Sequence, residues 1–229
     1  MRNLRGTIWF PVGLVARAAG WVARNRVRGP FMQLVMPADD SIALPGVEQG
    51  GLRERLKQAT SSAHRGLDAQ LSGFDLTSGR GYLRFLEASA AALLPIEEAL
   101  ERAGVGAIFD DWPSRSRRTV IAADIRSLGG TVRSLPDIGA LNCNQVIGTM
   151  YVLEGSRLGA KVLLKTITAS ADSTIMGATR YLRHGAGLHL WRSFLDVLER
   201  EAFAPDDEAE IFAGARQAFA TFATAAARA

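Results

Sequence analysis

The chain has 229 residues, 48% of them hydrophobic and 22% charged, a balance typical of a globular domain with a sizeable core. Its single cysteine, Cys143, excludes an internal disulfide framework and a zinc site built from several cysteines, and it fits a reducing cytoplasm. The formal net charge is +4, and residues 1–31 alone contribute +6 because they hold six arginines and no acidic residue. Residues 32–229 therefore carry a net charge of −2 and lack the positive balance of a nucleic-acid-binding protein.

Residues 1–50 are expected to be a leader and linker outside the folded domain. Residues 1–31 are apolar and rich in arginine, but the longest apolar run is far below the ~20 residues that span a bilayer. Three interpretations stay open: translated sequence upstream of a start at Met32 or Met36, an amphipathic segment on a membrane surface, and a targeting peptide. Residues 37–51, rich in Pro, Gly and acid, are typical of a linker or disordered approach.

From Leu52 onward, apolar residues recur every three or four positions, which predicts helices almost throughout. No segment alternates as a strand would, so we expect an all-α, single-domain bundle of six to eight helices over residues 51–229. The predicted helices cover residues 52–71, 78–104, 113–129, 141–169, 174–183, 188–203 and a terminal stretch from 205 onward.

One histidine of the first helix, His64, has two polar neighbours in helical register. Lys57 lies two turns earlier on the same face, roughly 10 Å along the axis, about the distance from a heme iron to the propionates at the porphyrin edge. Asp68 follows one turn later, where its carboxylate can accept a hydrogen bond from the imidazole and fix its orientation. Taken alone, each of these residue types lies more often on a solvated surface or in the core. Their shared register favours the interpretation that His64 binds a metal.

The fourth helix carries three glycines, Gly148, Gly155 and Gly159, each of which costs the helix about 1 kcal/mol relative to alanine. Gly155 and Gly159 are four residues apart, so they leave the backbone bare on one face. Contact with another helix and contact with a flat ligand both explain such a face. Ser156 beside these glycines, together with His64, favours the ligand.

Three segments carry a family resemblance: LKQATSSAH in the first helix, YVLEGSRLGAKVL in the fourth, and the weaker WRSFLDVLEREAF…ARQAFATF near the end. From about Leu52 to the C-terminus the chain resembles the heme oxygenases, in particular the bacterial, biliverdin-producing type associated with bacteriophytochromes. The resemblance implies oxidative cleavage of heme by O2 and reductant to biliverdin, CO and ferrous iron, with heme as both substrate and cofactor. An external reductase or ferredoxin would supply electrons, because no Gly-rich nucleotide-binding loop is visible, and a bacteriophytochrome would receive the biliverdin.

The resemblance also implies residue roles. Iron would be ligated by His64, with Asp68 behind the ligand; the propionates would meet Lys57 and Arg192, and the pocket would be walled by Gly155, Gly159 and Phe219. The chain departs from the family pattern at two positions. Ser156 stands where the best-known members have an aspartate that organises a proton-carrying water network, and Ala160 stands where a further glycine is usual.

These two departures keep a second function open, a non-catalytic protein that binds or sequesters heme on the same fold. A helical di-iron carboxylate protein would need Glu-x-x-His pairs on facing helices. Neither His184 nor His189 has an acidic residue three positions earlier, so the sequence argues against that class.

Overall fold

The structure is a computed structural model that describes residues 51–168, 173–200 and 203–229; the leader over 1–50 lies outside these residues. The described residues form helices and no strand, which confirms the all-α fold. No helix within these ranges has both the length and the apolar character to cross a membrane. The helices are α2 (Leu52–Leu71), α3 (Gly79–Arg102), α4 (Val105–Ile108), α5 (Trp112–Arg115), α6 (Arg118–Ser127), α7 (Cys143–Thr168), α8 (Ser173–Gly177), α9 (Arg180–Arg183), α10 (Leu190–Arg200) and α11 (Pro205–Arg228).

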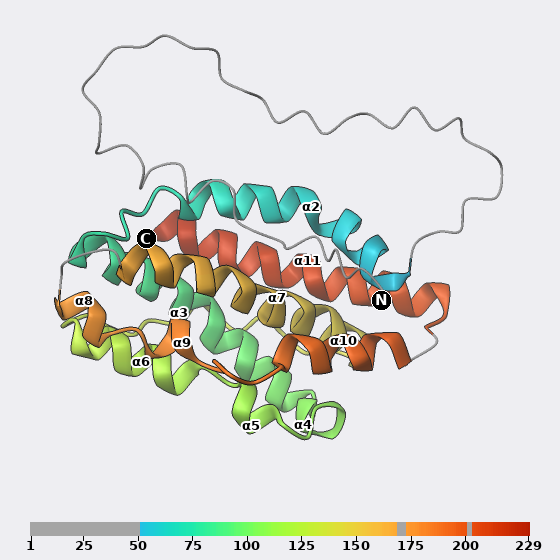
Figure 1. The fold of residues 1–229 in the computed structure, drawn as a ribbon. Coiled ribbons are helices and arrows are strands. Elements are labelled where there is room, and N and C mark those ends of the chain that lie inside the picture. The colour runs from blue at the N-terminus through green and yellow to red at the C-terminus, as the bar shows by residue number, and fades with distance from the viewer. Residues whose placement is uncertain (1–50, 169–172, 201–202) are drawn as a thin grey trace, which may run out of the picture.

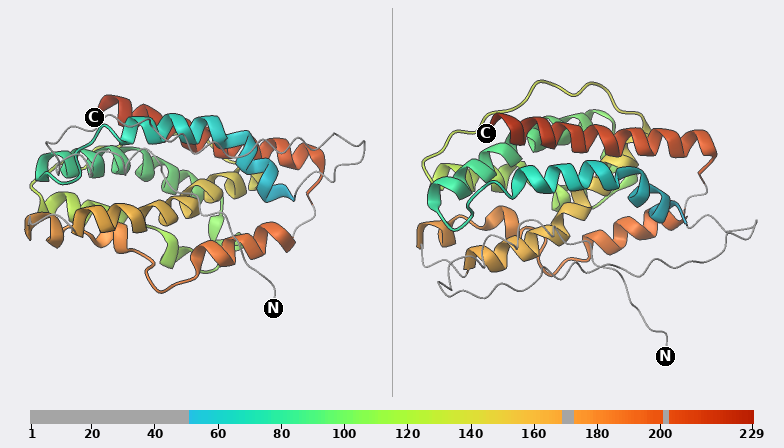
Figure 2. Two further views of the ribbon diagram at one scale, coloured as in Figure 1. Left: turned by 45° about the horizontal axis from the view of Figure 1, so that its top comes forward. Right: turned by 90° about the horizontal axis from the view of Figure 1, so that it is seen from above.

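The C-terminal helix α11 packs against α7, α2 and α3 and joins the long helices into one bundle (Figure 1). Helices α2, α7 and α11 run in the same direction, and α3 runs in the opposite one (Figure 2). Two side-chain contacts are consistent with the directions of α2, α3 and α11. Arg55 pairs with Glu208 near the starts of α2 and α11, whereas Arg84 near the start of α3 donates to the backbone oxygen of Ala229 beyond the end of α11.

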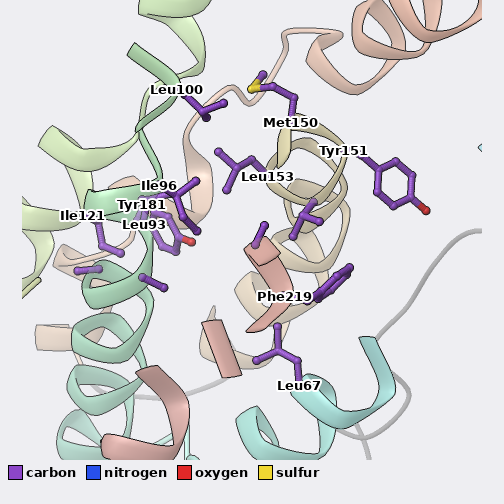
Figure 3. Packing of buried hydrophobic residues seen from close by; sticks show 14 of the residues in the cluster. Leu67, Leu93, Ile96, Leu100, Ile121, Met150, Tyr151, Leu153, Tyr181 and Phe219 are labelled. Atoms are coloured by element: carbon purple, nitrogen blue, oxygen red, sulfur yellow. The ribbon is translucent and has the colours of Figure 1, made fainter. Parts of the chain in front are cut away.

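The core lies between α3, α6 and α7. Leu93 and Ile96 of α3 are three residues apart and therefore share one face of the helix, where both are fully buried. Figure 3 shows Ile121 of α6 and Tyr181 of α9 beside them, with Leu153 of α7 on the facing side. Each such side chain contributes roughly 1.5–3 kcal/mol when it is fully buried. This packing joins α3 to α6 and, through α9, to α7, which leaves another face of α7 for the site described below.

Two glycines let α7 and α11 approach until their backbones touch. A Cβ atom at Gly148 would overlap the backbone oxygen of Ile211 and lie 2.8 Å from the backbone nitrogen of Ala215. A Cβ atom at Gly214 would in turn overlap the backbone oxygen of Gln145. Of the two explanations for glycine in the fourth predicted helix, contact between helices therefore applies to Gly148.

The described residues contain ten helices, so the prediction of six to eight is too low. The predicted helix over 113–129 is divided into α5 and α6 because Ser116 is extended. Glu97, fully buried in α3, accepts hydrogen bonds from the Ser116 hydroxyl and from the backbone N–H groups of Arg117 and Arg118. A side chain from another helix thus satisfies the free N–H groups at the start of α6. The short α4 was not predicted, and the segment 174–183 is likewise divided, into α8 and α9.

Candidate functional site

A cavity with about 1310 Å³ of empty space, part of it open solvent at its mouth, lies mainly between α2 and α7. Its walls are largely apolar, and helices α3, α9, α10 and α11 add side chains to them. Pockets of this kind hold large apolar ligands that are oriented by a few polar groups. The charged groups at this cavity come from α2 and from the start of α6, and uncharged polar side chains come from α3, α7 and α9.

His64 and Asp68 of α2 both line the cavity and contact each other. The imidazole Nδ1 lies 2.9 Å from Asp68 Oδ2, which is the contact that their spacing predicts. Because a carboxylate accepts hydrogen bonds, this contact assigns the ring proton to Nδ1 and leaves Nε2 as the nitrogen suited to a metal. The Phe219 ring stands edge-on to the imidazole, with ring centroids 5.8 Å apart. Figure 3 shows Phe219 of α11 directed between α2 and α7, close to Leu67.

Two cationic side chains of α2 lie on the cavity one turn apart. Lys57 has its Nζ 3.2 Å from Glu54 Oε1, and the Arg53 guanidinium lies 5.9 Å from the centroid of the Trp191 ring. Arg53 was missed by the sequence analysis. Arg192, which the resemblance implied, has a side chain that is 76% exposed, lies 3.6 Å from Asp196, and is absent from the described cavity lining. The structure therefore brings Lys57 and Arg53 to the cavity and leaves Arg192 outside it.

The facing wall is the second half of α7. Gly155, Ser156 and Gly159 all line the cavity, as does Ala160. A Cβ atom at Gly155 would make ordinary contact with the Trp191 ring, at 3.7 Å. A Cβ atom at Gly155 thus meets a side chain rather than another backbone, and Gly155 and Gly159 both lie on the cavity across from α2.

A second residue that the sequence analysis missed is Arg117, whose side chain is 2% exposed and lines the cavity. Its Nη1 donates to Ser156 Oγ at 3.1 Å, and its Nη2 donates to the backbone oxygen of Leu153 at 3.2 Å. Its guanidinium carbon lies 5.3 Å from the centroid of the Tyr181 ring. In the sequence Arg117 belongs to an Arg- and Ser-rich run at the start of the predicted helix over 113–129. Such a run is typical of a solvated surface and gives no signal of burial.

The sequence profile of the heme oxygenase family matches residues 51–228. The chain belongs to the heme oxygenase family. It is 26% identical over 190 residues to heme oxygenase PigA of Pseudomonas aeruginosa, covering 80% of this chain and 95% of that protein. It is 29% identical over 147 residues to a heme oxygenase of Xanthomonas campestris pv. campestris, covering 62% and 87%. The NO- and CO-bound heme oxygenase of Neisseria meningitidis shares the fold with a TM-score of 0.67 at 23% identity, over 78% of this chain and 91% of that one.

The cavity of this heme oxygenase fits heme, the group on which the family acts. Its apolar walls suit a macrocycle, and the cations at Lys57 and Arg53 suit the two carboxylates that a heme carries. Arg117 lines the cavity, and its buried Nε has no hydrogen-bond partner among the described residues. As a member of this family the chain is an oxygen-dependent oxidoreductase for which heme and O2 are the reactants.

A charged cluster lies behind the α7 wall of the site. Glu154 is 1% exposed and pairs through Oε2 with Arg157 at 2.9 Å and with Arg115 at 3.3 Å. Burial lowers the pKa of the Arg157 guanidinium, and the charge of Arg117 lowers it further. Burial likewise lowers the pKa of His184, whose Nδ1 lies 3.3 Å from Arg157 Nη1. The cluster connects α5 and α7 with the segment between α9 and α10, and it holds the helix that carries Gly155 and Ser156.

Proposed function

We propose that this heme oxygenase holds heme between α2 and α7, with His64 as the iron ligand, and opens it to biliverdin, CO and ferrous iron. The observation that carries the proposal is the His64–Asp68 pair on one wall of an apolar cavity whose other wall is the glycine face of α7. When bound, heme supplies the iron at which O2 is reduced and the carbon skeleton that is oxidised.

The residues of the chain bind and orient the substrate. Asp68 accepts a hydrogen bond from Nδ1, so Nε2 is the nitrogen of His64 that would bind iron, and the carboxylate would keep the ring in that orientation. Lys57 and Arg53 attract the propionates and thereby set the rotation of the macrocycle in its plane. On the other face, Gly155 and Gly159 allow the α7 backbone to approach the ring closely, and Phe219 and the other apolar walls exclude water.

Turnover consumes electrons, and we propose that an external reductase or ferredoxin supplies them. The exposed guanidinium of Arg53 beside Trp191 leaves a cationic edge at the cavity where a partner could approach. We further propose that biliverdin passes to a bacteriophytochrome and that the reaction takes place in the cytoplasm, which the single cysteine supports.

The second candidate function is a heme carrier without turnover, which the serine at position 156 favours because it removes a carboxylate from the distal wall. Mixing the protein with heme and a reductant in air separates the two. Oxygenase activity predicts loss of the Soret band and a rising biliverdin absorbance. A heme spectrum that persists after repeated reduction in air would favour the carrier.

The ligand assignment predicts the behaviour of His64→Ala. This variant should lose the histidine-ligated heme spectrum and weaken heme binding by more than the ~10-fold that loss of an outer partner costs, and added imidazole should restore the spectrum. Absorbance titration with heme measures both effects. His189→Ala is the matched control, because His189 is exposed and does not line the cavity. An unchanged spectrum in His64→Ala would show that another residue ligates the iron.

A further inference from the structure

Glu154 immediately precedes Gly155 on α7, but it is not among the described residues that line the cavity. Its side chain is 1% exposed. One carboxylate oxygen, Oε2, accepts a hydrogen bond from Arg157 Nε at 2.9 Å and lies 3.3 Å from Arg115 Nη1. Because a buried carboxylate must be paired to stay charged, Glu154 and the two arginines form one unit.

This unit contacts the beginning of α10. Arg115 is 2% exposed, and it donates from Nη1 to the backbone oxygen of Leu190 at 3.0 Å and from Nη2 to Ser193 Oγ at 2.7 Å. Both acceptors belong to the first turn of α10. Asp111 also pairs with Arg115, but it lies only four residues earlier, so this pair does not connect α5 to another helix. Glu154 is therefore the carboxylate that ties Arg115, and with it the first turn of α10, to α7.

The first turn of α10 contains Trp191, whose ring forms part of the cavity wall. The indole stacks on Phe194 of the same helix, with ring centroids 5.6 Å apart, and its centroid lies 5.8 Å from that of the Tyr151 ring. A Cβ atom at Gly155 would lie 3.7 Å from the indole. Because side chains leave a helix in fixed directions, the contacts that hold the first turn of α10 also set the direction of Trp191.

The connection between α9 and α10 is held at its other end by the same unit. Its first residue, His184, accepts a hydrogen bond at its backbone oxygen from Arg157 Nη1 at 3.4 Å. The following Gly185 and Gly187 have φ angles of 76° and 86°, and Leu188 between Gly187 and α10 is exposed. Glycine adopts many backbone conformations at little cost, so these residues permit more than one path of the chain. The position of α10 therefore relies on the contacts made by the buried arginines.

We propose that Glu154 is a positioning residue of the heme site, which acts through Arg115 and the first turn of α10 to keep Trp191 against the cavity. The inference rests on the proposed function, in which heme occupies this cavity. It gives a role in substrate binding to a carboxylate that does not touch the substrate. The charge of Glu154 should matter more than its shape, because it holds two buried guanidinium groups.

Glu154→Gln separates the charge from the shape. Oε1 is buried and has no hydrogen-bond partner among the described residues, so the amide nitrogen can take its place while the amide oxygen still accepts from Arg157. The variant thus keeps this hydrogen bond and loses the charge. Glu101→Gln is the matched control, because Glu101 pairs with Arg118 and neither of these two residues is part of the described cavity lining. It should bind heme as the parent does.

A double-mutant cycle with Trp191→Ala tests whether Glu154 acts through the indole ring. The full chain is titrated with ferric heme and followed by absorbance. Glu154→Gln should weaken heme binding roughly 10-fold in the parent, within the range of couplings in one network, and by less than about 2-fold when residue 191 is already alanine. Equal losses in the two backgrounds would show a general structural effect and overturn the proposal. An unchanged affinity in the parent background would also overturn it.

Ser193→Ala provides the same test if Glu154→Gln does not fold. It removes only the hydroxyl that accepts from Arg115 Nη2. Heme binding should weaken by roughly 2- to 10-fold in the parent, as expected for one hydrogen bond, and should not change further in Trp191→Ala. Equal weakening in both backgrounds, or none in the parent, would contradict the proposal. A parent chain without a histidine-ligated heme spectrum would instead overturn the proposed function, on which the inference depends.

Discussion

The two halves of α7 use the same residue type in opposite ways. In the first half, Gly148 lies where α7 crosses α11, and a Cβ atom there would overlap the backbone of Ile211. In the second half, Gly155 lies on the cavity, and a Cβ atom there would find ordinary contact with Trp191 at 3.7 Å. One half of the helix is held in place by its neighbour, and the other half is open to a ligand.

This difference shows how a helix tolerates several glycines. Each one costs about 1 kcal/mol relative to alanine, so each needs a compensating gain. At Gly148 the gain is the close packing of two backbones, which is realised as soon as the chain folds. At Gly155 the gain is space beside the cavity, which is realised only when a ligand binds. The two glycines should therefore respond to the same substitution with opposite changes in stability.

The largest expected effect is that of Gly148→Ala. The added methyl group meets backbone atoms of Ile211 and Ala215, which cannot move without shifting α11, so the free energy of unfolding should fall by about 3 kcal/mol or more. Urea denaturation followed by circular dichroism measures this loss. A variant as stable as the parent would show that α7 and α11 do not cross as closely as described.

A smaller effect of opposite sign is expected for Gly155→Ala. Alanine should stabilise α7 by about 0.5–1 kcal/mol, because the methyl group makes only ordinary contact with the Trp191 ring and the helix propensity improves. The same methyl group narrows the cavity beside Trp191, so heme affinity should fall by about 10-fold. Denaturation of the heme-free protein and heme titration separate these two effects. If Gly155→Ala were destabilised like Gly148→Ala, the contrast between the two halves would be lost.

Sequence reasoning predicted relations within one helix well, because the helical repeat fixes them. Lys57, His64 and Asp68 were expected on one face of the first helix, and all three line the cavity. The same repeat separates two neighbouring residues of α10. Trp191 lines the cavity, whereas Arg192 is directed outward, since neighbouring residues on a helix differ by about 100° in direction.

Relations between helices could not be predicted in the same way. Gly148 and Gly155 are both interior glycines of one apolar helix, and only the position of α11 distinguishes them. Arg117 is 39 residues from Ser156 in the sequence, within an Arg- and Ser-rich run that is typical of a solvated helix start. Its burial depends on Glu97, which comes from another helix and caps α6. The residues that complete the distal wall therefore became visible only in the folded chain.

The smallest expected effect concerns the outer side of the second half of α7, where Arg157 meets His184. Burial lowers the pKa of His184 from its ordinary 6.5, and the positive charges of Arg157 and Arg117 lower it further, against a weaker opposing effect of Glu154. Between 6.5 and this lowered value, the unfolded chain binds more protons than the folded chain. The free energy of unfolding should therefore fall as the pH drops through this window.

His184→Gln removes the titrating group, so the variant should lose less stability than the parent between about pH 7.5 and about pH 5. Urea denaturation at the two pH values measures the difference. His189→Gln is the control, because His189 belongs to the same connection between α9 and α10 but is exposed. Equal losses in the parent and His184→Gln would show that neither burial nor the neighbouring arginines lower the pKa of His184 in the folded chain. The charged cluster would then stabilise the second half of α7 equally at both pH values. Only the glycines of that half would then account for the space beside it.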